Sequence, residues 1–144
     1  MMLKLLSNQI PDYWEVIKHT ISNTDAVEDQ NLPGYLNNLL HDLLSDKAQC
    51  FFRIDPESRK IYTVVVTRIE ENRLSGYKTF IMQSVFSFEA EDIKKRELER
   101  DFLKDFAKRR ECSSIVFKSP HPAAWKLGKA MGFKEIHRAY MYQL

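Results

Sequence analysis

The chain has 144 residues, and its 44% hydrophobic content supplies enough apolar material for the core of one domain. Its 22 Lys and Arg against 20 Asp and Glu leave a formal charge of +2, too small and too evenly mixed to gather nucleic acid or anionic lipid. Cys50 and Cys112 lack the spacing of a metal site or a disulfide framework, and no apolar run suits a signal peptide or membrane span. We therefore expect one domain over residues 1–144, without a metal, in the reducing cytoplasm.

The first third of the sequence predicts a short strand and two helices. Residues 3–6 suit the strand, and Pro11 and Asp12 begin a helix that carries Trp14, Ile17 and Ile21 on one face. A polar loop is expected over residues 22–31. The next helix follows Pro33-Gly34 and has leucines at helical spacing, which we interpret as core: Leu36, Leu39, Leu40, Leu43 and Leu44.

Three consecutive antiparallel strands are predicted in the middle of the chain. They span residues 49–54, 60–69 and 77–88, with turns at residues 55–58 and 72–76. The second strand has β-branched residues on both faces, which indicates that both faces are covered. In the third strand, period 2 places four side chains on one face: Phe80, Met82, Phe86 and Phe88.

The last third alternates helix and strand. A helix from about Asp92 is expected to bury one face, made of Leu98, Phe102, Leu103, Phe106 and Ala107. Residues 114–118 suit a short buried strand, and the following helix turns Ala124, Leu127, Gly128 and Met131 inward and ends at Gly132. Residues 133–144 are predicted to close the chain as a strand. The predicted fold class is α/β (α+β), a mixed and mainly antiparallel sheet flanked by helices.

One local pattern resembles a known family. The strand Ile115-Val116-Phe117 precedes Ala124, Leu127 and Gly132-Phe133, which is similar to the strand and N-x-x-A-x-x-L-Y-x-x-x-G-F segment of the GNAT N-acetyltransferase superfamily. The element order over nearly the whole chain also resembles that fold. Alternatively, these positions are only what any helix-strand unit needs, because glycine ends helices readily.

The resemblance implies acetyl-CoA or another acyl-CoA as cofactor. The family holds its phosphates in a Q/R-x-x-G-x-G/A loop at the start of the central helix, and its pantetheine arm in a gap between diverging strands. Here the gap would lie beside Phe86 and Phe88. The loop would fall near residues 94–99, which contain no glycine and place glutamates there. Lys94, Lys95 and Arg96 either bind phosphate instead or are exposed charges balanced by nearby carboxylates.

The catalytic residues that the resemblance implies are Glu89 and His121. Glu89 would be the general base at the end of the long strand, or alternatively only a strand-end charge. The family's general-acid tyrosine falls on Gly128, and its asparagine falls on His121. Either solvent supplies the proton or another group does, and His121 is the nearest titratable group to act as acid; alternatively, His121 is only a histidine in a surface turn.

Large aromatic side chains suggest either packing or an interface. Trp14 suits the core, whereas Trp125 falls off the inward face of its helix and Tyr140 and Tyr142 lie on the last predicted strand. They line a pocket, or a subunit contact in a homodimer. The sequence thus predicts an acyltransferase acting on a small-molecule or protein amine, or alternatively a non-catalytic binding or regulatory protein of the same fold.

Overall fold

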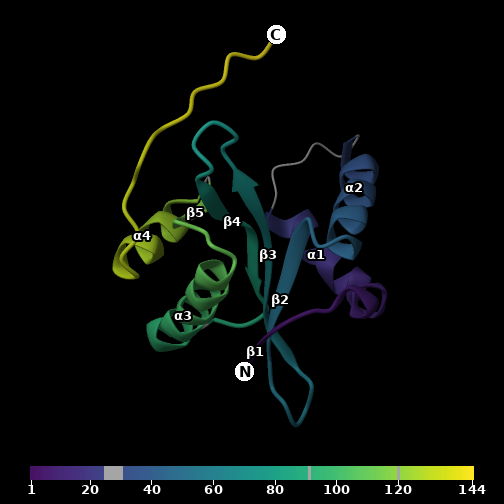
Figure 1. Ribbon diagram of the computed structural model, residues 1–144. Coiled ribbons are helices and arrows are strands. Elements are labelled where there is room, and N and C mark those ends of the chain that lie inside the picture. The colour runs from purple at the N-terminus through teal and green to yellow at the C-terminus, as the bar shows by residue number, and fades with distance from the viewer. Residues whose placement is uncertain (25–30, 91, 120) are drawn as a thin grey trace.

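The computed structural model describes residues 1–24, 31–90, 92–119 and 121–144 (Figure 1). Two short 3-10 helices, Ser7–Gln9 and Pro11–Tyr13, lie between β1 and α1. The helices and strands, in chain order, are β1 (Met2–Lys4), α1 (Trp14–Thr24), α2 (Leu32–Leu44), β2 (Ala48–Ile54), β3 (Ile61–Glu71), β4 (Lys78–Ser87), α3 (Ile93–Arg109), β5 (Ser114–Phe117) and α4 (Pro122–Ala130).

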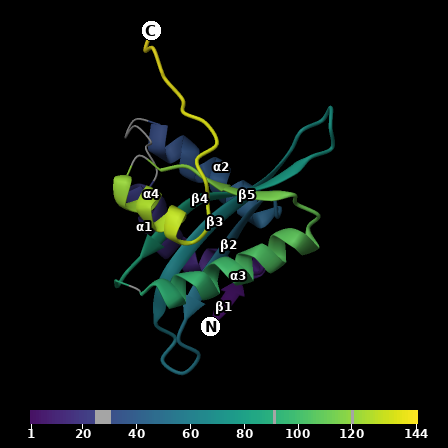
Figure 2. The same ribbon diagram turned by 90° about the vertical axis from the view of Figure 1, so that its left-hand side faces the viewer.

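The strands form one sheet with the order β1-β2-β3-β4-β5. The pairs β1–β2, β2–β3 and β3–β4 are antiparallel, whereas β5 runs parallel to β4. Helices α1 and α2 cover one face of the sheet, and α3 and α4 cover the other (Figures 1 and 2). The predicted mixed, mainly antiparallel sheet flanked by helices is confirmed, including the three consecutive antiparallel strands.

The face under α1 and α2 carries the larger core. Ile17 and Ile21 of α1 and Leu39 and Leu43 of α2 are buried against Cys50, Phe52, Val64 and Val66 of the sheet. These helical residues repeat every three or four positions, so each helix turns one apolar stripe to the sheet. The leucine stripe is therefore core, as predicted, although Leu44 at the end of α2 is exposed.

The face under α3 has a separate core of phenylalanines. Phe51 of β2 contacts Phe80 of β4 and Phe106 of α3, with ring centroids 6.3 and 5.0 Å away. Since β3 lies between the two helical layers, Val64 packs in the core under α1 and α2, and Val65 packs in the core under α3. The β-branched run of β3 is therefore covered on both faces, as predicted.

A β-bulge in β4 changes the face of the sheet to which its side chains point. Val66 of β3 pairs with Ser84, but the next residue, Thr67, pairs with Met82, so Gln83 is the extra residue of the bulge. Phe80 and Met82 pack under α3, whereas Phe86 lies against α1. The prediction that Phe80, Met82, Phe86 and Phe88 share one face was wrong, because the extra residue reverses the alternation.

Two further predictions from helix and strand periodicity were wrong. Leu98 was placed on the inner face of α3, but it is 69% exposed and its neighbour Glu99 is buried instead. Residues 133–144 do not form a strand: they leave α4 and extend away from the body of the protein (Figure 1). Most of the predicted loop over residues 22–31 lies outside the described residues, and α1 continues to Thr24.

Candidate functional site

The sheet opens where β4 and β5 separate. Among the described residues, β5 pairs with β4 only from Thr79 to Met82, and the last pair is Met82 with Phe117. Beyond it β4 continues to Ser87, so the β4 edge after the bulge has no neighbouring strand in that part of the chain. Bulges bend and twist the strand that carries them. The bulge at Gln83 therefore accounts for the separation, and no strand of the described chain runs along this edge of β4 beyond it.

The start of α3 lies close to this open edge. Asp92 caps the helix, because its carboxylate accepts a hydrogen bond of 2.9 Å from the backbone N–H of Lys95. The side chains of Lys94 and Lys95 are exposed. Arg96 instead points into the fold, where its Nη2 donates to Ser87 Oγ at 2.6 Å. Of the three predicted phosphate ligands, only Lys94 and Lys95 are therefore free to meet an anion from solvent.

A buried charged network ties α3 to the sheet. Glu99 is 4% exposed and accepts hydrogen bonds from Arg53 Nε at 3.0 Å, Thr63 Oγ1 at 3.0 Å and Arg96 Nη1 at 3.2 Å. Because its charge is matched by two guanidinium groups, Glu99 does not present a carboxylate to a ligand at the helix start. The burial of Glu99 was not predicted from the sequence. It could have been inferred from the position of Glu99, which lies four residues before Leu103 and therefore on the apolar face of α3.

Phe86 and Phe88 form an aromatic cluster on the α1 face of the sheet. The ring of His19 meets Phe86 edge-on at 5.3 Å and stacks on Phe88 at 5.9 Å, and the two phenylalanines are 5.0 Å apart. The cluster adjoins the open end of β4. Both rings pack toward α1, so they do not bar the β4 edge to a ligand.

Glu89, the predicted general base, follows directly after the end of β4. Its carboxylate is half-exposed and pairs with Lys60, which lies just before β3. This hydrogen bond and the charge of Glu89 raise the pKa of Lys60. Glu89 thus lies near the cluster of Phe86 and Phe88, on the side of β3, and its partner there is Lys60 and not His121.

His121, the predicted general acid, is the N-cap residue of α4. Its side chain is exposed, and its backbone N–H donates to Ser119 Oγ at 3.1 Å. Trp125 fixes the same connection, because its indole Nε1 donates to the Ser119 carbonyl at 2.6 Å. Trp125 is also half-exposed, as its place off the inner face of α4 predicted.

Gly128 explains why the tyrosine of the sequence pattern is missing. A Cβ atom at this buried position would lie 2.5 Å from Phe117 Cζ and 2.8 Å from Cε1. The Phe117 ring also meets Phe133 edge-on, with centroids 5.2 Å apart. A side chain at residue 128 would therefore require the Phe117 ring or α4 to move.

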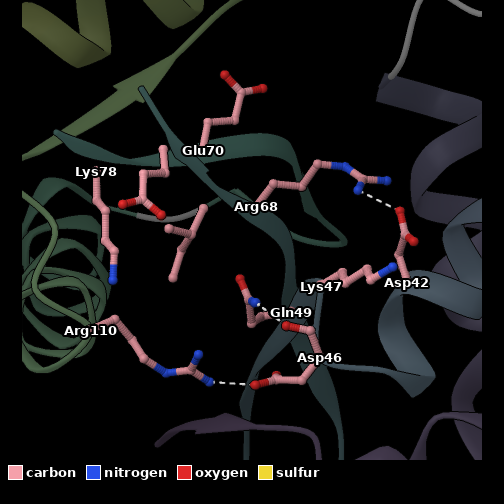
Figure 3. A pocket seen from close by; sticks show the side chains of 10 residues that line it. Asp42, Asp46, Lys47, Gln49, Arg68, Glu70, Lys78 and Arg110 are labelled. Carbon is pink, nitrogen blue, oxygen red and sulfur yellow. Dashed lines mark hydrogen bonds and ion pairs between the residues drawn. The ribbon is translucent and has the colours of Figure 1, made fainter. Parts of the chain in front are cut away.

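A polar cavity of about 560 Å³ lies at the opposite end of the sheet, between the ends of α2 and α3 (Figure 3). Two ion pairs cross it: Arg68 with Asp42 at 2.6 Å, and Arg110 with Asp46 at 2.5 Å. Lys4 also meets Asp46, at 3.1 Å. Burial alone would raise the pKa of Asp46, but the hydrogen bonds from Arg110 and Lys4 lower it overall. These pairs join both helical layers to the sheet, away from the open end of β4.

Neither a metal site nor a membrane span is found in the described part of the chain. It has no group of three or more His, Cys, Asp or Glu side chains placed to hold a metal ion. None of its helices is long and apolar enough to cross a bilayer. Both cysteines are free thiols, with Cys50 buried and Cys112 half-buried.

Solved structures with the same architecture are acetyltransferases. The ribosomal-protein-alanine N-acetyltransferase of Brucella melitensis biovar Abortus 2308 superimposes with a TM-score of 0.68 at 14% identity, covering 100% of this chain and 99% of its own. An aminoglycoside acetyltransferase from an uncultured soil metagenomic sample, in complex with sisomicin, gives 0.70 at 12% identity, covering 100% and 95%. The chain has the GNAT fold. The sequence itself matches no protein-family model and no curated protein.

A further structural neighbour has CoA bound. A third neighbour, the aminoglycoside N-acetyltransferase AAC(6')-Iy in complex with CoA, has a TM-score of 0.67 at 12% identity and covers 100% of this chain and 93% of its own. At such identities the likeness concerns the fold. Function must therefore be argued from the open β4 edge, the start of α3 and the residues around them.

Proposed function

We propose that this protein is an acyltransferase that moves an acyl group from acetyl-CoA or another acyl-CoA to an amine. The observation that carries the proposal is the bulge at Gln83, beyond which β4 leaves β5 and has no strand of the described chain along that edge, beside the start of α3. An extended amide-containing arm is the kind of ligand that hydrogen-bonds to such an edge. Neighbours of the same fold include enzymes acting on aminoglycosides and on ribosomal-protein alanine, which supports an amine acceptor, either a small molecule or a protein.

The residues at the helix start suit the anionic end of such a donor. Lys94 and Lys95 are exposed in the first turn of α3, where the helix dipole adds to their positive charge. Glu99 is neutralised inside the fold by Arg53 and Arg96, so the repulsion expected from its carboxylate is removed. We propose that the two lysines bind phosphate by ion pairing, in place of a glycine-rich backbone loop.

The chemistry requires one proton acceptor and one proton donor. The bound acyl-CoA supplies an activated thioester, in which the acyl carbon-sulfur bond breaks as the amine nitrogen bonds to that carbon. We propose that Glu89 takes the proton released from the amine, since its side chain lies at the end of β4, where it pairs with Lys60. We propose that His121, exposed at the start of α4, returns a proton to the departing sulfur. Gly128 takes no part, because Phe117 fills its surroundings.

Calorimetric titration with acetyl-CoA tests binding. Lys94→Glu together with Lys95→Glu should weaken binding at least ~10-fold, because two attractive charges become repulsive. The matched control is Lys108→Glu, an exposed lysine in the last turn of the same helix, which should leave binding unchanged. Absence of heat and of any thermal shift with millimolar acetyl-CoA would contradict the proposal.

Turnover is then measured as release of free CoA with a panel of amines that includes aminoglycosides, polyamines and peptides. Glu89→Gln and His121→Ala should each lower kcat by about 10²–10⁴, the usual contribution of acid-base groups. Binding of acetyl-CoA should survive both changes. Binding without turnover on any amine would instead favour the non-catalytic alternative, which the acetyltransferase neighbours do not favour.

A further inference from the structure

The side chain of Gln83, the extra residue of the β4 bulge, is held between α2 and β3. Its Oε1 accepts a hydrogen bond of 2.7 Å from Arg68 Nε of β3, and its Nε2 donates to the phenol oxygen of Tyr35 on α2. A guanidinium group only donates hydrogen bonds, so the amide oxygen must face Arg68 and the amide nitrogen must face Tyr35. Gln83 is therefore fixed in one orientation of its amide, on the α2 side of the sheet.

Asp42 of α2 holds Arg68 in turn. Arg68 Nη1 donates to Asp42 Oδ2 at 2.6 Å, and the two side chains are 29% and 28% exposed (Figure 3). Tyr35 and Asp42 are seven residues apart, so they lie on one face of α2, about 10 Å apart along the helix axis. A chain of hydrogen bonds thus runs from α2 through both strands and back to α2. We call its four residues the bulge clamp: Tyr35, Gln83, Arg68 and Asp42.

The bulge clamp selects which residue of β4 is the extra one. Met82, directly before Gln83, packs under α3, whereas Ser84, directly after it, pairs with Val66 and is buried. The backbone pattern itself does not require Gln83 at this place, since a bulge requires only that two residues oppose one. A bulge that moves to Met82 or Ser84 displaces the bend of β4 by one residue, or about 3.3 Å.

The position of this bend bears on acyl transfer, because Met82 is the last residue of β4 that pairs with β5. An acyl donor that lies along β4 beyond this point is displaced together with the bend. A misplacement of about 1 Å can lower a rate about 100-fold, even when the altered residue is far from the chemistry. A shift by one residue is larger than that tolerance.

We propose that Gln83 is a positioning residue for the acyl donor, and that Tyr35 and Arg68 act through it by keeping the bulge at residue 83. The inference rests on the proposed acyl transfer, although the place of the bulge can be measured without it. These three side chains need not touch the donor. They fix where β4 bends, and with it the distance from the β4 edge to Lys94 and Lys95 at the start of α3.

Two substitutions of Gln83 separate the hydrogen bonds from the size of the side chain. Gln83→Leu removes both bonds at similar size, whereas Gln83→Glu keeps both, because a carboxylate accepts from Arg68 and from the Tyr35 hydroxyl. With acetyl-CoA and the amine panel, kcat should fall about 100-fold in Gln83→Leu and stay near the unaltered value in Gln83→Glu. KM for acetyl-CoA should change less than about threefold in both, since the lysines proposed to bind phosphate are untouched.

A purely structural contact predicts a different result. It would lower the free energy of unfolding of Gln83→Leu without lowering kcat per folded molecule. Arg110→Gln is the matched control, because it breaks the ion pair with Asp46 in the cavity that Arg68 also lines. This variant should leave kcat and the place of the bulge unchanged.

NMR locates the bulge independently of catalysis. In the unaltered chain and in Gln83→Glu, cross-strand nuclear Overhauser effects should join Val66 to Ser84 and Thr67 to Met82, the pairs that the structure shows. In Gln83→Leu these effects should weaken, and new ones should join Val66 or Thr67 to residue 83.

The outcomes distinguish the clamp from the activity. The inference is overturned if Gln83→Leu keeps the original strand pairs, or moves the bulge yet keeps its kcat. An equal loss of kcat in Gln83→Glu and Gln83→Leu also overturns it, because the amide itself is then required. An unaltered chain that neither binds acetyl-CoA nor turns over any amine contradicts the proposed function and ends the role in donor positioning, whereas the strand pairs still show whether the clamp holds the bulge.

Discussion

Replacing Gly128 by alanine tests how closely α4 packs on β5. The new Cβ atom would stand 2.5 Å from Phe117 Cζ, a separation that real Cβ atoms essentially never show. Either the ring or the helix must move, and overpacking of this kind costs about 1–3 kcal/mol. Alanine regains up to ~1 kcal/mol relative to glycine in a helix interior. The free energy of unfolding should therefore fall by as much as about 2 kcal/mol.

Gly34→Ala is the matched control, because Gly34 also lies in a helix but a Cβ atom added there would have no neighbouring atom within 4 Å. It should raise the free energy of unfolding by about 0.5–1 kcal/mol, the propensity gain alone. Urea denaturation of both variants should thus show a difference of about 1–3 kcal/mol, equal to the overpacking cost. In a Phe117→Leu background, Gly128→Ala should become neutral or stabilising. If Gly128→Ala stabilises the unaltered chain as Gly34→Ala does, the explanation for the missing tyrosine is wrong.

Three other changes have expected outcomes. Glu99→Gln should lower the free energy of unfolding by about 3–5 kcal/mol, since Arg53 and Arg96 lose their buried counter-charge. Urea denaturation measures this change. As a control, Glu135→Gln removes the charge of a surface ion pair and should hardly change the free energy of unfolding. Asp46→Asn should remove stability at neutral pH. Because the folded pKa of Asp46 lies below its ordinary value of 3.8, the difference from the unaltered chain should be constant above that pH and vanish as pH falls through the lowered value. Burial raises the pKa of the Cys50 thiol, so Ellman's reagent should modify Cys50 only upon unfolding.

The helices and the antiparallel strands could be predicted because their signals are local. Ile17 and Ile21, or Leu39 and Leu43, must face one way in any helix, and burial against a sheet follows from that periodicity alone. The bulge at Gln83 could not be predicted in this way. It adds one residue without altering composition, and every residue after it changes face.

On the inner face of α3, a prediction from hydrophobic periodicity failed because the buried residue is charged. Leu98 and Glu99 are neighbours, and apolar character favoured Leu98 as the buried one. The structure buries Glu99 because Arg53 and Thr63, far away in the sequence, supply its hydrogen bonds. A buried charge of this kind depends on partners that only the tertiary fold brings together.

The sequence indicated which elements carry the candidate site residues, but not the direction of each side chain. The start of α3 and the end of β4 do lie together, since Arg96 donates to Ser87 across them. That bond, however, removes Arg96 from the set of residues able to meet a ligand. Sequence position fixes which element carries a residue, but the direction of the side chain depends on packing across elements.

The absence of the GNAT tyrosine from α4 has a cause in the packing of Phe117. Phe117 ends β5 at the point where β4 leaves it, and its ring fills the space above Gly128 and beside Phe133. A tyrosine at residue 128 and a phenylalanine at residue 117 are therefore mutually exclusive in this packing. No side chain at residue 128 can therefore protonate a departing sulfur. His121, exposed at the start of the same helix, is the residue that we propose for that role.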